Sequence, residues 1–280
     1  MKPIRFYVMS DLHTSGKTGR IARALELCKD GQFVLLAGDL VNDGKESQFV
    51  KLKKIIEEKL TDMPVFSVSG NHDYPILPVP SIRNECCDYS AFQDWLHQRA
   101  QSMGISVIRD ASGAYAVDYG DVAVIGLNCT SHWRRFVFKD GAELEWLEKY
   151  LKDSQARWHV IMCHAPLAAH HANGRPDILR TYLSRDSKLQ RILDRHSNII
   201  FASGHTHISP YVPEGQPDVD HERHNLYLNC GSVCTAALKG HEAEFPREYA
   251  DGNVMEILIE GERVEVVTHL IHNRHWGEQV

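Results

Sequence analysis

The sequence predicts an α/β protein in which strands and helices alternate and to which a second, partly antiparallel sheet is added. Short runs of apolar and β-branched residues recur as far as position 228, and each has the length of a buried strand. Between several of these runs, apolar residues are spaced three and four positions apart, which is the period of a helix. Near the C-terminus, two alternating segments flank a short turn, which is typical of a β-hairpin. This alternation of elements is that of the α/β class.

The individual elements follow from these patterns in chain order. The expected strands are residues 4–9, 33–37, 65–68, 122–127, 159–163, 199–202 and 226–228. Helical spacing is seen in Phe49, Leu52, Ile56 and Leu60, and again in Leu144, Leu147 and Leu151. We therefore expect one helix between the second and third strands and another before the strand that begins at residue 159.

The C-terminal part differs from the rest of the chain. Residues 254–260 and 263–268 alternate between apolar and polar side chains around Gly261-Glu262, so we expect a hairpin that completes the second sheet. Neither a repeat nor a low-complexity linker interrupts the sequence, and we expect residues 1–280 to form a single domain. Segments rich in Pro, Gly, His and charge are expected to be loops gathered near a site: 75–88, 132–141, 170–176 and 209–223.

Composition narrows the class of function. Lys and Arg number 31 and Asp and Glu 37, a net charge of −6, which argues against a general nucleic-acid binder. Apolar runs are too short to span a bilayer, and the N-terminal segment lacks the apolar stretch and cleavage site of a secretory signal. Seven irregularly spaced cysteines fit reduced thiols better than a disulfide framework. We therefore expect a cytoplasmic protein that acts on a small molecule, with neither a membrane nor a nucleic acid as partner.

The chemistry is concentrated where the expected strands end. Five of these strands are each followed by a side chain that can bind a metal ion. These side chains are Asp11 and His13, then Asp39, then Asn71 followed by His72, then His164, and finally His205 and His207. Ligands of open α/β sheets bind in the crevice beyond the carboxyl ends of the strands. If the strands are parallel neighbours, all five clusters converge on one crevice.

The spacing within each cluster suits a shared ion. In an extended segment, residues two apart point to the same side, so Asp11 and His13 can bind one ion together, and so can His205 and His207. A glycine directly precedes three of the clusters and would let the backbone turn sharply and approach the ions closely. These glycines are Gly38, Gly70 and Gly204.

The donor atoms indicate the metal and the reaction. Imidazole, carboxylate and amide groups without a thiolate suit Mn, Fe or Zn. Seven candidate ligands are too many for one tetrahedral ion and about right for two ions that share a carboxylate bridge, for which we expect Asp39. Two ions about 3.5–4 Å apart clamp the attacking and leaving oxygens in phosphoryl displacement. The sequence therefore predicts a phosphoester substrate.

In this order and at these separations, the motifs resemble those of the calcineurin-like metallophosphoesterase superfamily. The resemblance extends from residue 4 to about residue 232. It rests on Asp11-x-His13, Gly38-Asp39, Gly70-Asn71-His72-Asp73, His164 and Gly204-His205-x-His207. It implies a four-layer sandwich of two packed mixed sheets flanked by helices.

The same resemblance implies a role for each residue. It implies that one metal ion is held by Asp11, His13, Asp39 and His207, and the other by Asp39, Asn71, His164 and His205. It further implies that a hydroxide bridging the ions attacks phosphorus, with His72 beside the leaving oxygen as a general acid or a charge stabiliser. An imidazole titrates near neutral pH, which suits that role. Asn71 would supply a neutral oxygen and so ease the approach of an anionic substrate.

The chain departs from its relatives at two places. The protein Ser/Thr phosphatases of the superfamily have an acid-arginine pair shortly after the Gly-Asp motif, and no arginine follows Asp39 here, which disfavours a phosphoprotein substrate. In related phosphodiesterases the third position after the bridging Asp carries an acid that orients the catalytic histidine, whereas Asn42 stands here. Either Asn42 or Asp43 could take that task. The pattern most resembles the bacterial cyclic-nucleotide and glycerophosphodiester phosphodiesterase branch.

Three other functions remain open from the sequence. A phosphomonoesterase would use every one of the same ligands, because loops that the sequence does not position decide the preference for a diester. A nuclease would need a local basic track. A non-catalytic scaffold would keep the fold and typically lose ligands, whereas every position is filled here.

Overall fold

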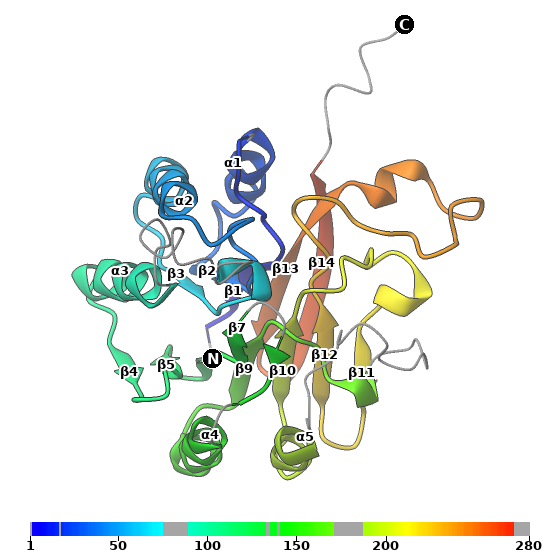
Figure 1. The fold of residues 1–280 in the computed structure, drawn as a ribbon. Coiled ribbons are helices and arrows are strands. Elements are labelled where there is room, and N and C mark those ends of the chain that lie inside the picture. The colour runs from blue at the N-terminus through cyan, green and yellow to red at the C-terminus, as the bar shows by residue number, and fades with distance from the viewer. Residues whose placement is uncertain are drawn as a thin grey trace, which may run out of the picture.

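Two β-sheets are stacked face to face, and helices cover the outer face of each sheet (Figure 1). The computed structural model describes residues 2–16, 18–74, 89–132, 135–138, 141–170 and 187–271. The expected loop at 75–88 lies outside these residues, and so does the expected loop at 170–176 apart from His170. Within the described part, no helix is both long and apolar enough to cross a membrane.

The first sheet has five strands in the order β14-β13-β1-β2-β3. Its strands are β1 (Ile4–Met9), β2 (Phe33–Leu36), β3 (Val65–Ser67), β13 (Gly252–Glu260) and β14 (Arg263–Ile271). The first three are parallel neighbours, whereas β13 runs antiparallel to β1. The expected C-terminal hairpin is therefore present, but it extends the sheet of β1 and does not contribute to the other sheet. Pairing with the free edge of β1 buries the apolar face of β13 in the same core.

The second sheet has seven strands in the order β11-β12-β10-β9-β6-β5-β4. Its strands are β4 (Val107–Arg109), β5 (Tyr115–Asp118), β6 (Val122–Leu127), β9 (Trp158–Cys163), β10 (Ile199–Ser203), β11 (Asp218–Asp220) and β12 (Asn225–Asn229). Four of these strands were expected from the sequence, and they run parallel: β6, β9, β10 and β12. The other three were not expected and pair antiparallel: β4, β5 and β11. Two of those three, β4 and β11, are short edge strands with mostly exposed side chains, so they carry little apolar pattern.

Two segments expected to be loops contain regular structure. A small two-stranded sheet, β7 (Thr130–His132) and β8 (Arg135–Phe136), lies within the stretch 132–141 and just before it. The stretch 209–223 contains β11 and the 3-10 turn η3 (Pro213–Gly215). Strands this short do not produce the alternation from which a strand is recognised in a sequence.

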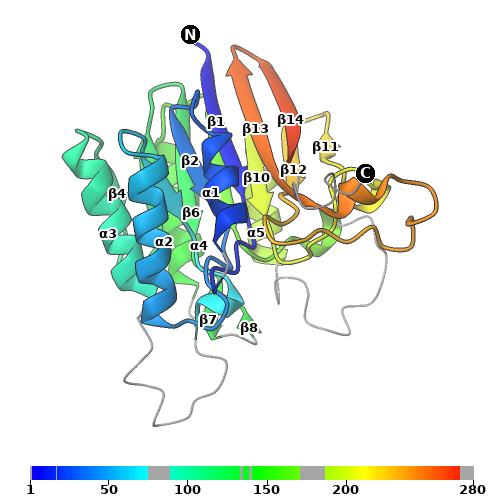
Figure 2. The same ribbon diagram turned by 90° about the horizontal axis from the view of Figure 1, so that it is seen from above.

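In the described part of the chain, five α-helices flank the sheets, three packed on the first sheet and two on the second (Figures 1 and 2). They are α1 (Gly19–Glu26), α2 (Glu46–Lys59), α3 (Tyr89–Ser102), α4 (Ala142–Asp153) and α5 (Ser187–Leu193). The two helices expected from apolar spacing are α2 and α4. Further 3-10 turns are η1 (Asn71–Asp73), η2 (Ala168–His170) and η4 (Arg247–Ala250).

Strand alternation produces three apolar layers. In β1, Phe6 and Val8 face the space between the sheets, where they are fully buried. Tyr7 and Met9 face the other way and pack under the helices of the first sheet. A third apolar cluster joins the outer face of the second sheet to α4 and α5. Three layers of core between four layers of backbone confirm the predicted α/β sandwich of two mixed sheets.

Candidate metal centre

The eight residues expected at the site follow the carboxyl ends of β1, β2 and β3 in one sheet and of β9 and β10 in the other. Seven of them form three overlapping groups whose possible ligand atoms lie within 4.8 Å of one another. The groups are Asp11 with His13 and His207, His13 with Asp39 and His72, and Asp39 with His164 and His205. The eighth residue, Asn71, is buried next to His72 in η1. The clusters thus converge at an edge shared by two stacked sheets, rather than in the crevice of one open sheet.

The backbone at these positions is not extended. Five of the candidate ligands have positive φ angles, a region that side chains other than Gly adopt at a cost of about 1 kcal/mol or more. They are Asp11 (55°), His13 (44°), Asp39 (50°), His205 (69°) and His207 (53°). The expectation that residues two apart converge through extended backbone is therefore wrong for Asp11-x-His13 and His205-x-His207. Asp11 and His13 share a group although both turn into the left-handed region, whereas His205 and His207 lie in different groups, contrary to the expectation that they bind one ion together.

The glycines before the clusters make room for neighbouring side chains. A Cβ on Gly38 would lie 2.5 Å from Nδ1 of His164, and one on Gly70 would lie 2.2 Å from both N and Oδ1 of Asp39. A Cβ on Gly204 would lie 1.7 Å from Oγ of Ser10. We expected these glycines to let the backbone approach the metal ions. In the structure they let the segment that carries one cluster pack against the side chains of a neighbouring cluster.

Asp11 directs one carboxylate oxygen into the site. Its Oδ2 accepts hydrogen bonds from Oγ of Ser10 at 2.6 Å and from the backbone N of His205 at 2.9 Å. Its Oδ1 lies 3.0 Å from Nε2 of His207 but accepts no well-formed hydrogen bond and is inaccessible to solvent. Burial alone would raise the pKa of Asp11, but contact with His207 outweighs burial and lowers it. Asp11 is therefore ionised, with one oxygen anchored and the other aimed at the histidines.

Asp39 occupies the middle of the constellation. Its Oδ1 accepts a hydrogen bond of 2.7 Å from the backbone N of His72. Its Oδ2 lies 3.3 Å from Nε2 of His164 and 3.9 Å from Nε2 of His13, two histidines that belong to different groups. Burial opposes ionisation, but the charges of the surrounding histidines, His164 first, lower the pKa of Asp39. A single carboxylate oxygen therefore faces both halves of the site.

His164 is held in one tautomer. Its Nδ1 lies 2.8 Å from the carbonyl oxygen of Ala37, and because a carbonyl only accepts, Nδ1 carries the hydrogen. Its Nε2 then faces Asp39 without a well-formed hydrogen bond. Burial lowers the pKa of His164, yet the Asp39 carboxylate outweighs burial and raises it to about 10. The surroundings thus favour a positive charge between Asp39 and His164, which a metal cation can supply as well as a proton.

His13 and His207 face each other across the other half. Their Nε2 atoms lie 3.1 Å apart. Two nitrogens about 2.1 Å from one ion lie about 3.0–3.4 Å apart in tetrahedral or octahedral geometry, so this separation suits two ligands of one cation. Burial lowers the pKa of His13, and for His207 contact with Asp11 overcomes burial and raises the pKa.

The structure answers how His72 is oriented. Its Nδ1 lies 2.8 Å from the backbone carbonyl oxygen of Asn42. The side chain of Asn42 instead donates to Asp43, and the Asp43 carboxylate accepts a further bond from Gln48. Neither of the two side chains considered from the sequence holds the ring. The main chain does, which explains why an acid is not needed at position 42.

Two residues that support the site were missed in the sequence. Asp73 is fully buried and accepts three backbone hydrogen bonds of 2.7–3.0 Å, from Gly70, Leu40 and Val41. Asn128, at the end of β6, accepts from the backbone N of Ser69 at 2.9 Å and so joins the second sheet to the segment that carries Asn71. Asp73 is adjacent to His72 in the sequence, which could have identified it. Asn128 carries no local signal.

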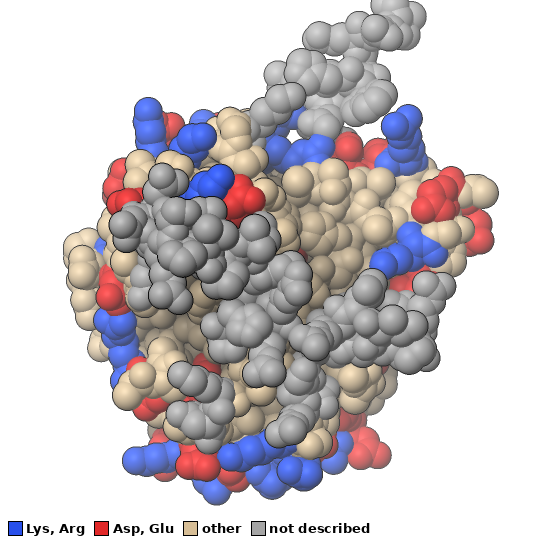
Figure 3. Space-filling model, in the orientation of Figure 1, with Lys and Arg blue, Asp and Glu red and all other residues tan. Residues whose placement is uncertain are grey.

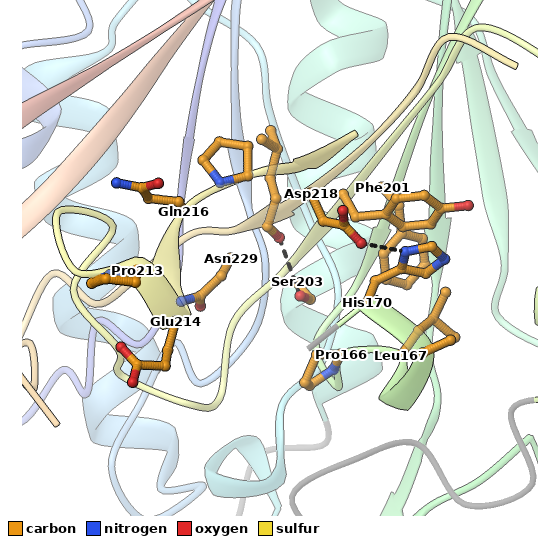
Figure 4. Close-up of a pocket in the computed structure, with 14 residues that line it drawn as sticks. Pro166, Leu167, His170, Phe201, Ser203, Pro213, Glu214, Gln216, Asp218 and Asn229 are labelled. Atoms are coloured by element: carbon orange, nitrogen blue, oxygen red, sulfur yellow. Dashed lines mark hydrogen bonds and ion pairs between the residues drawn. The ribbon is translucent and has the colours of Figure 1, made fainter. Parts of the chain in front are cut away.

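A separate pocket of about 290 Å³ lies at the outer face of the second sheet, between η2, η3 and the ends of β10 and β12 (Figure 4). His170 stacks on Tyr227 there, and its Nδ1 pairs with Asp218 at 2.8 Å. Among the described residues, the lining contains none of the eight site residues and no Lys or Arg. One wall residue, Asn229, accepts a hydrogen bond from Thr206, which lies between His205 and His207. The pocket thus adjoins the site, and its described lining offers no Lys or Arg to a phosphate.

The residues at the strand ends fit metal ions. Oδ1 of Asp11, Oδ1 of Asn71 and Nε2 of His164 are buried atoms without hydrogen-bond partners, and polar atoms of this kind are costly unless something pairs with them. All donors are nitrogen or oxygen, whereas Cys163 and Cys230 are buried in the apolar layers. The donor set therefore suits a centre of the Mn, Fe or Zn type rather than a thiolate site.

Comparison with known proteins agrees with this geometry. The profile of the calcineurin-like phosphoesterase family matches residues 4–209, and the chain therefore belongs to that family. It is a metal-dependent phosphoesterase of a family that uses a dimetal site, and it contains clusters of Asp and His that could hold metal ions. No curated protein matches the chain at a significant level.

Solved structures show the same fold at low sequence identity. The protein TT1561 of Thermus thermophilus is 9% identical with a TM-score of 0.57, over 96% of this chain and 99% of that one. GAP50, described as the anchor in the inner membrane complex of Plasmodium, is 13% identical with a TM-score of 0.56, over 96% and 85%. The 5'-nucleotidase of Candida albicans is 13% identical with a TM-score of 0.54, over 96% and 52%. At these identities the likeness concerns the fold alone.

Proposed function

We propose that this protein is a dinuclear phosphodiesterase that hydrolyses a small phosphodiester. One cation would be held by Asp11, His13, Asp39 and His207, and the other by Asp39, Asn71, His164 and His205. The observation that carries the proposal is the position of Asp39 Oδ2, which faces His164 on one side and His13 on the other. Because Oδ1 already accepts a hydrogen bond from His72 N, Oδ2 is the Asp39 oxygen left to face a cation.

The protein's own residues would prepare the site in three ways: through the two carboxylates, through His72 and through Asn71. Asp11 and Asp39 each anchor one oxygen by hydrogen bonds and leave the other for a cation. Two bound cations would supply a hydroxide at neutral pH and draw charge from the phosphoryl oxygens. The bond from His72 Nδ1 to the Asn42 carbonyl leaves Nε2 to donate a proton to the leaving oxygen when the ring is charged. Asn71 adds a buried neutral oxygen, so the site gains no further negative charge.

Two features favour a small diester over larger substrates. No arginine follows Asp39 in the segment Leu40 to Gly44, where the protein phosphatases have one, so a phosphoprotein is disfavoured. On the face shown in Figure 3, the visible Lys and Arg side chains of the described residues are interspersed with Asp and Glu and form no continuous basic track for a nucleic acid.

The test uses protein reconstituted with Mn²⁺, Fe²⁺ or Zn²⁺ in separate samples. We expect two ions per chain, hydrolysis of bis(p-nitrophenyl) phosphate, and a kcat/KM for this diester above that for p-nitrophenyl phosphate. A higher kcat/KM for the monoester would make the protein a phosphomonoesterase, and faster cleavage of single-stranded DNA would make it a nuclease. Less than two ions per chain under all three conditions would refute the dinuclear assignment.

A further inference from the structure

Phe136 brings the small β7–β8 sheet into contact with the metal centre. It is only 3% exposed, although the strand that carries it is two residues long. Its ring centroid lies 4.5 Å from that of His205 at 69° and 5.8 Å from that of His164 at 52°. The two imidazoles are themselves 5.3 Å apart at 71°. Phe136 with His205 and His205 with His164 therefore pack edge to face, which is a favourable arrangement for aromatic pairs, whereas Phe136 and His164 are tilted.

The contact is confined to one half of the site. His164 and His205 belong to the same group as Asp39, which we assign to one of the two cations. The imidazoles of the other half, His13 and His207, are tilted by 43° with centroids 5.1 Å apart, and no ring contact with Phe136 is found for them in the described residues. A change at Phe136 should therefore affect the two cations unequally.

His205 depends on this packing more than His164 does. The ring of His164 is fixed by its hydrogen bond to Ala37. For His205, the backbone N bonds to Asp11, but the described residues contribute no hydrogen bond to its ring nitrogens. Its backbone is also in the left-handed region, with φ of 69°, a conformation that persists only where the surrounding structure holds it. Phe136 is the ring packed closest to it.

We propose that Phe136 is a positioning residue that holds the His205 ring, and with it His164, ready for the cation shared with Asp39. This inference rests on the proposed dinuclear function. A ligand that is already oriented loses less conformational freedom on binding, so affinity falls when the support is removed. The cation at Asp11, His13 and His207 should be unaffected.

The experiment follows Mn²⁺ binding to the full chain by equilibrium dialysis with elemental analysis, together with electron paramagnetic resonance. We expect wild type to bind two ions and to show the spectrum of a coupled pair. Phe136→Ala should bind the first ion with unchanged affinity, weaken the second at least tenfold, and show the six-line spectrum of an isolated ion at intermediate Mn²⁺. Phe136→Leu keeps most of the apolar volume but lacks a ring, so its affinity for the second ion should lie between those of wild type and Phe136→Ala.

Phe92→Ala is the matched control. Phe92 is fully buried in another apolar layer, where its ring packs against Phe49 and Trp95. This variant should lose stability and still bind two ions. The inference is overturned if Phe136→Ala and Phe136→Leu bind the second ion as wild type does, or if Phe92→Ala loses it to the same extent. A wild-type protein that binds fewer than two ions would instead refute the proposed function, whatever the variants do.

Discussion

The Nδ1 atom of His72 lies 2.8 Å from the backbone carbonyl oxygen of Asn42, although 30 residues separate the two in the chain. A carbonyl oxygen can only accept, so the ring carries a hydrogen on Nδ1, and Nε2 bears none while the ring is neutral. The orientation of the proposed proton donor therefore depends on the path of the backbone after Asp39. It does not depend on the side chain at position 42.

This contact predicts that a substitution of His72 lowers kcat strongly, whereas a substitution of the Asn42 side chain changes it little. His72→Ala removes the proposed general acid and should lower kcat by at least about 100-fold while both metal ions are retained. Asn42→Ala keeps the carbonyl and loses only a partly exposed bond to Asp43, so kcat should stay within about threefold of wild type. Steady-state hydrolysis of an aryl diester, with metal content measured in parallel, checks both. A large loss of kcat in Asn42→Ala would show that its side chain, and not its main chain, orients the ring.

Asp73 should be essential to the stability of the same region. Its two oxygens together accept three backbone N–H groups, from Leu40, Val41 and Gly70, in a fully buried position. In Asp73→Asn one oxygen becomes an NH₂ group that has to face a backbone donor. The free energy of unfolding should fall by about 2–3 kcal/mol, because a buried donor is left unsatisfied.

Urea unfolding measures this loss, and the exposed Asp62→Asn is the matched control that should unfold like wild type. If Asp73→Asn were as stable as wild type, the three hydrogen bonds would contribute no net stability.

The site was easier to predict from the sequence than its surroundings, for a physical reason. Candidate ligands such as Asp39 and His164 come at or soon after the ends of buried strands, and a buried strand is visible as an apolar run. The strands themselves were found for the same reason. What failed was local conformation: Asp11 and His13 were expected on extended backbone, and both have positive φ. Such angles depend on tertiary packing that a spacing pattern does not contain.

The supporting residues could not be predicted, because they act across long separations. Phe136 lies in a two-residue strand of an expected loop, and Asn128 reaches Ser69 from the other sheet. The C-terminal hairpin was recognised, but its partner was not, since pairing with β1 joins residues about 250 positions apart. Contacts of this kind depend on the topology, which neither propensity nor periodicity specifies.

Two buried histidines outside the site should make stability depend on pH. His97 and His159 are 2% and 7% exposed, and their ring nitrogens are without hydrogen-bond partners. Burial lowers the pKa of each from 6.5 to about 4. Above pH 6.5 both are neutral in the folded and the unfolded chain. Between pH 6.5 and 4 the unfolded chain binds protons that the folded chain does not, so the free energy of unfolding should fall, by about 3 kcal/mol for each histidine.

The measurement is urea unfolding at pH 7 and pH 4.5, with EDTA present so that metal loss does not contribute. The difference between the two pH values should be smaller in the double variant His97→Leu/His159→Leu than in wild type. His221→Gln, a substitution at an exposed position, should behave as wild type does. Equal pH dependence in wild type and the double variant would mean that these histidines titrate normally in the folded protein.

Gly70→Ala should disrupt the site by a single methyl group. The φ of Gly70 is −106°, which any residue adopts, so space and not backbone strain decides the outcome. The added Cβ would lie 2.2 Å from both N and Oδ1 of Asp39, which forces apart the two segments that meet there. We expect a loss of about 2–3 kcal/mol in the free energy of unfolding and loss of metal binding. Gly19→Ala is the matched control, because a Cβ there meets nothing within 4 Å and Ala favours the start of α1. Elemental analysis and urea unfolding of both variants test the prediction, and a Gly70→Ala protein that binds two ions would show that Asp39 can move aside without losing its place between them.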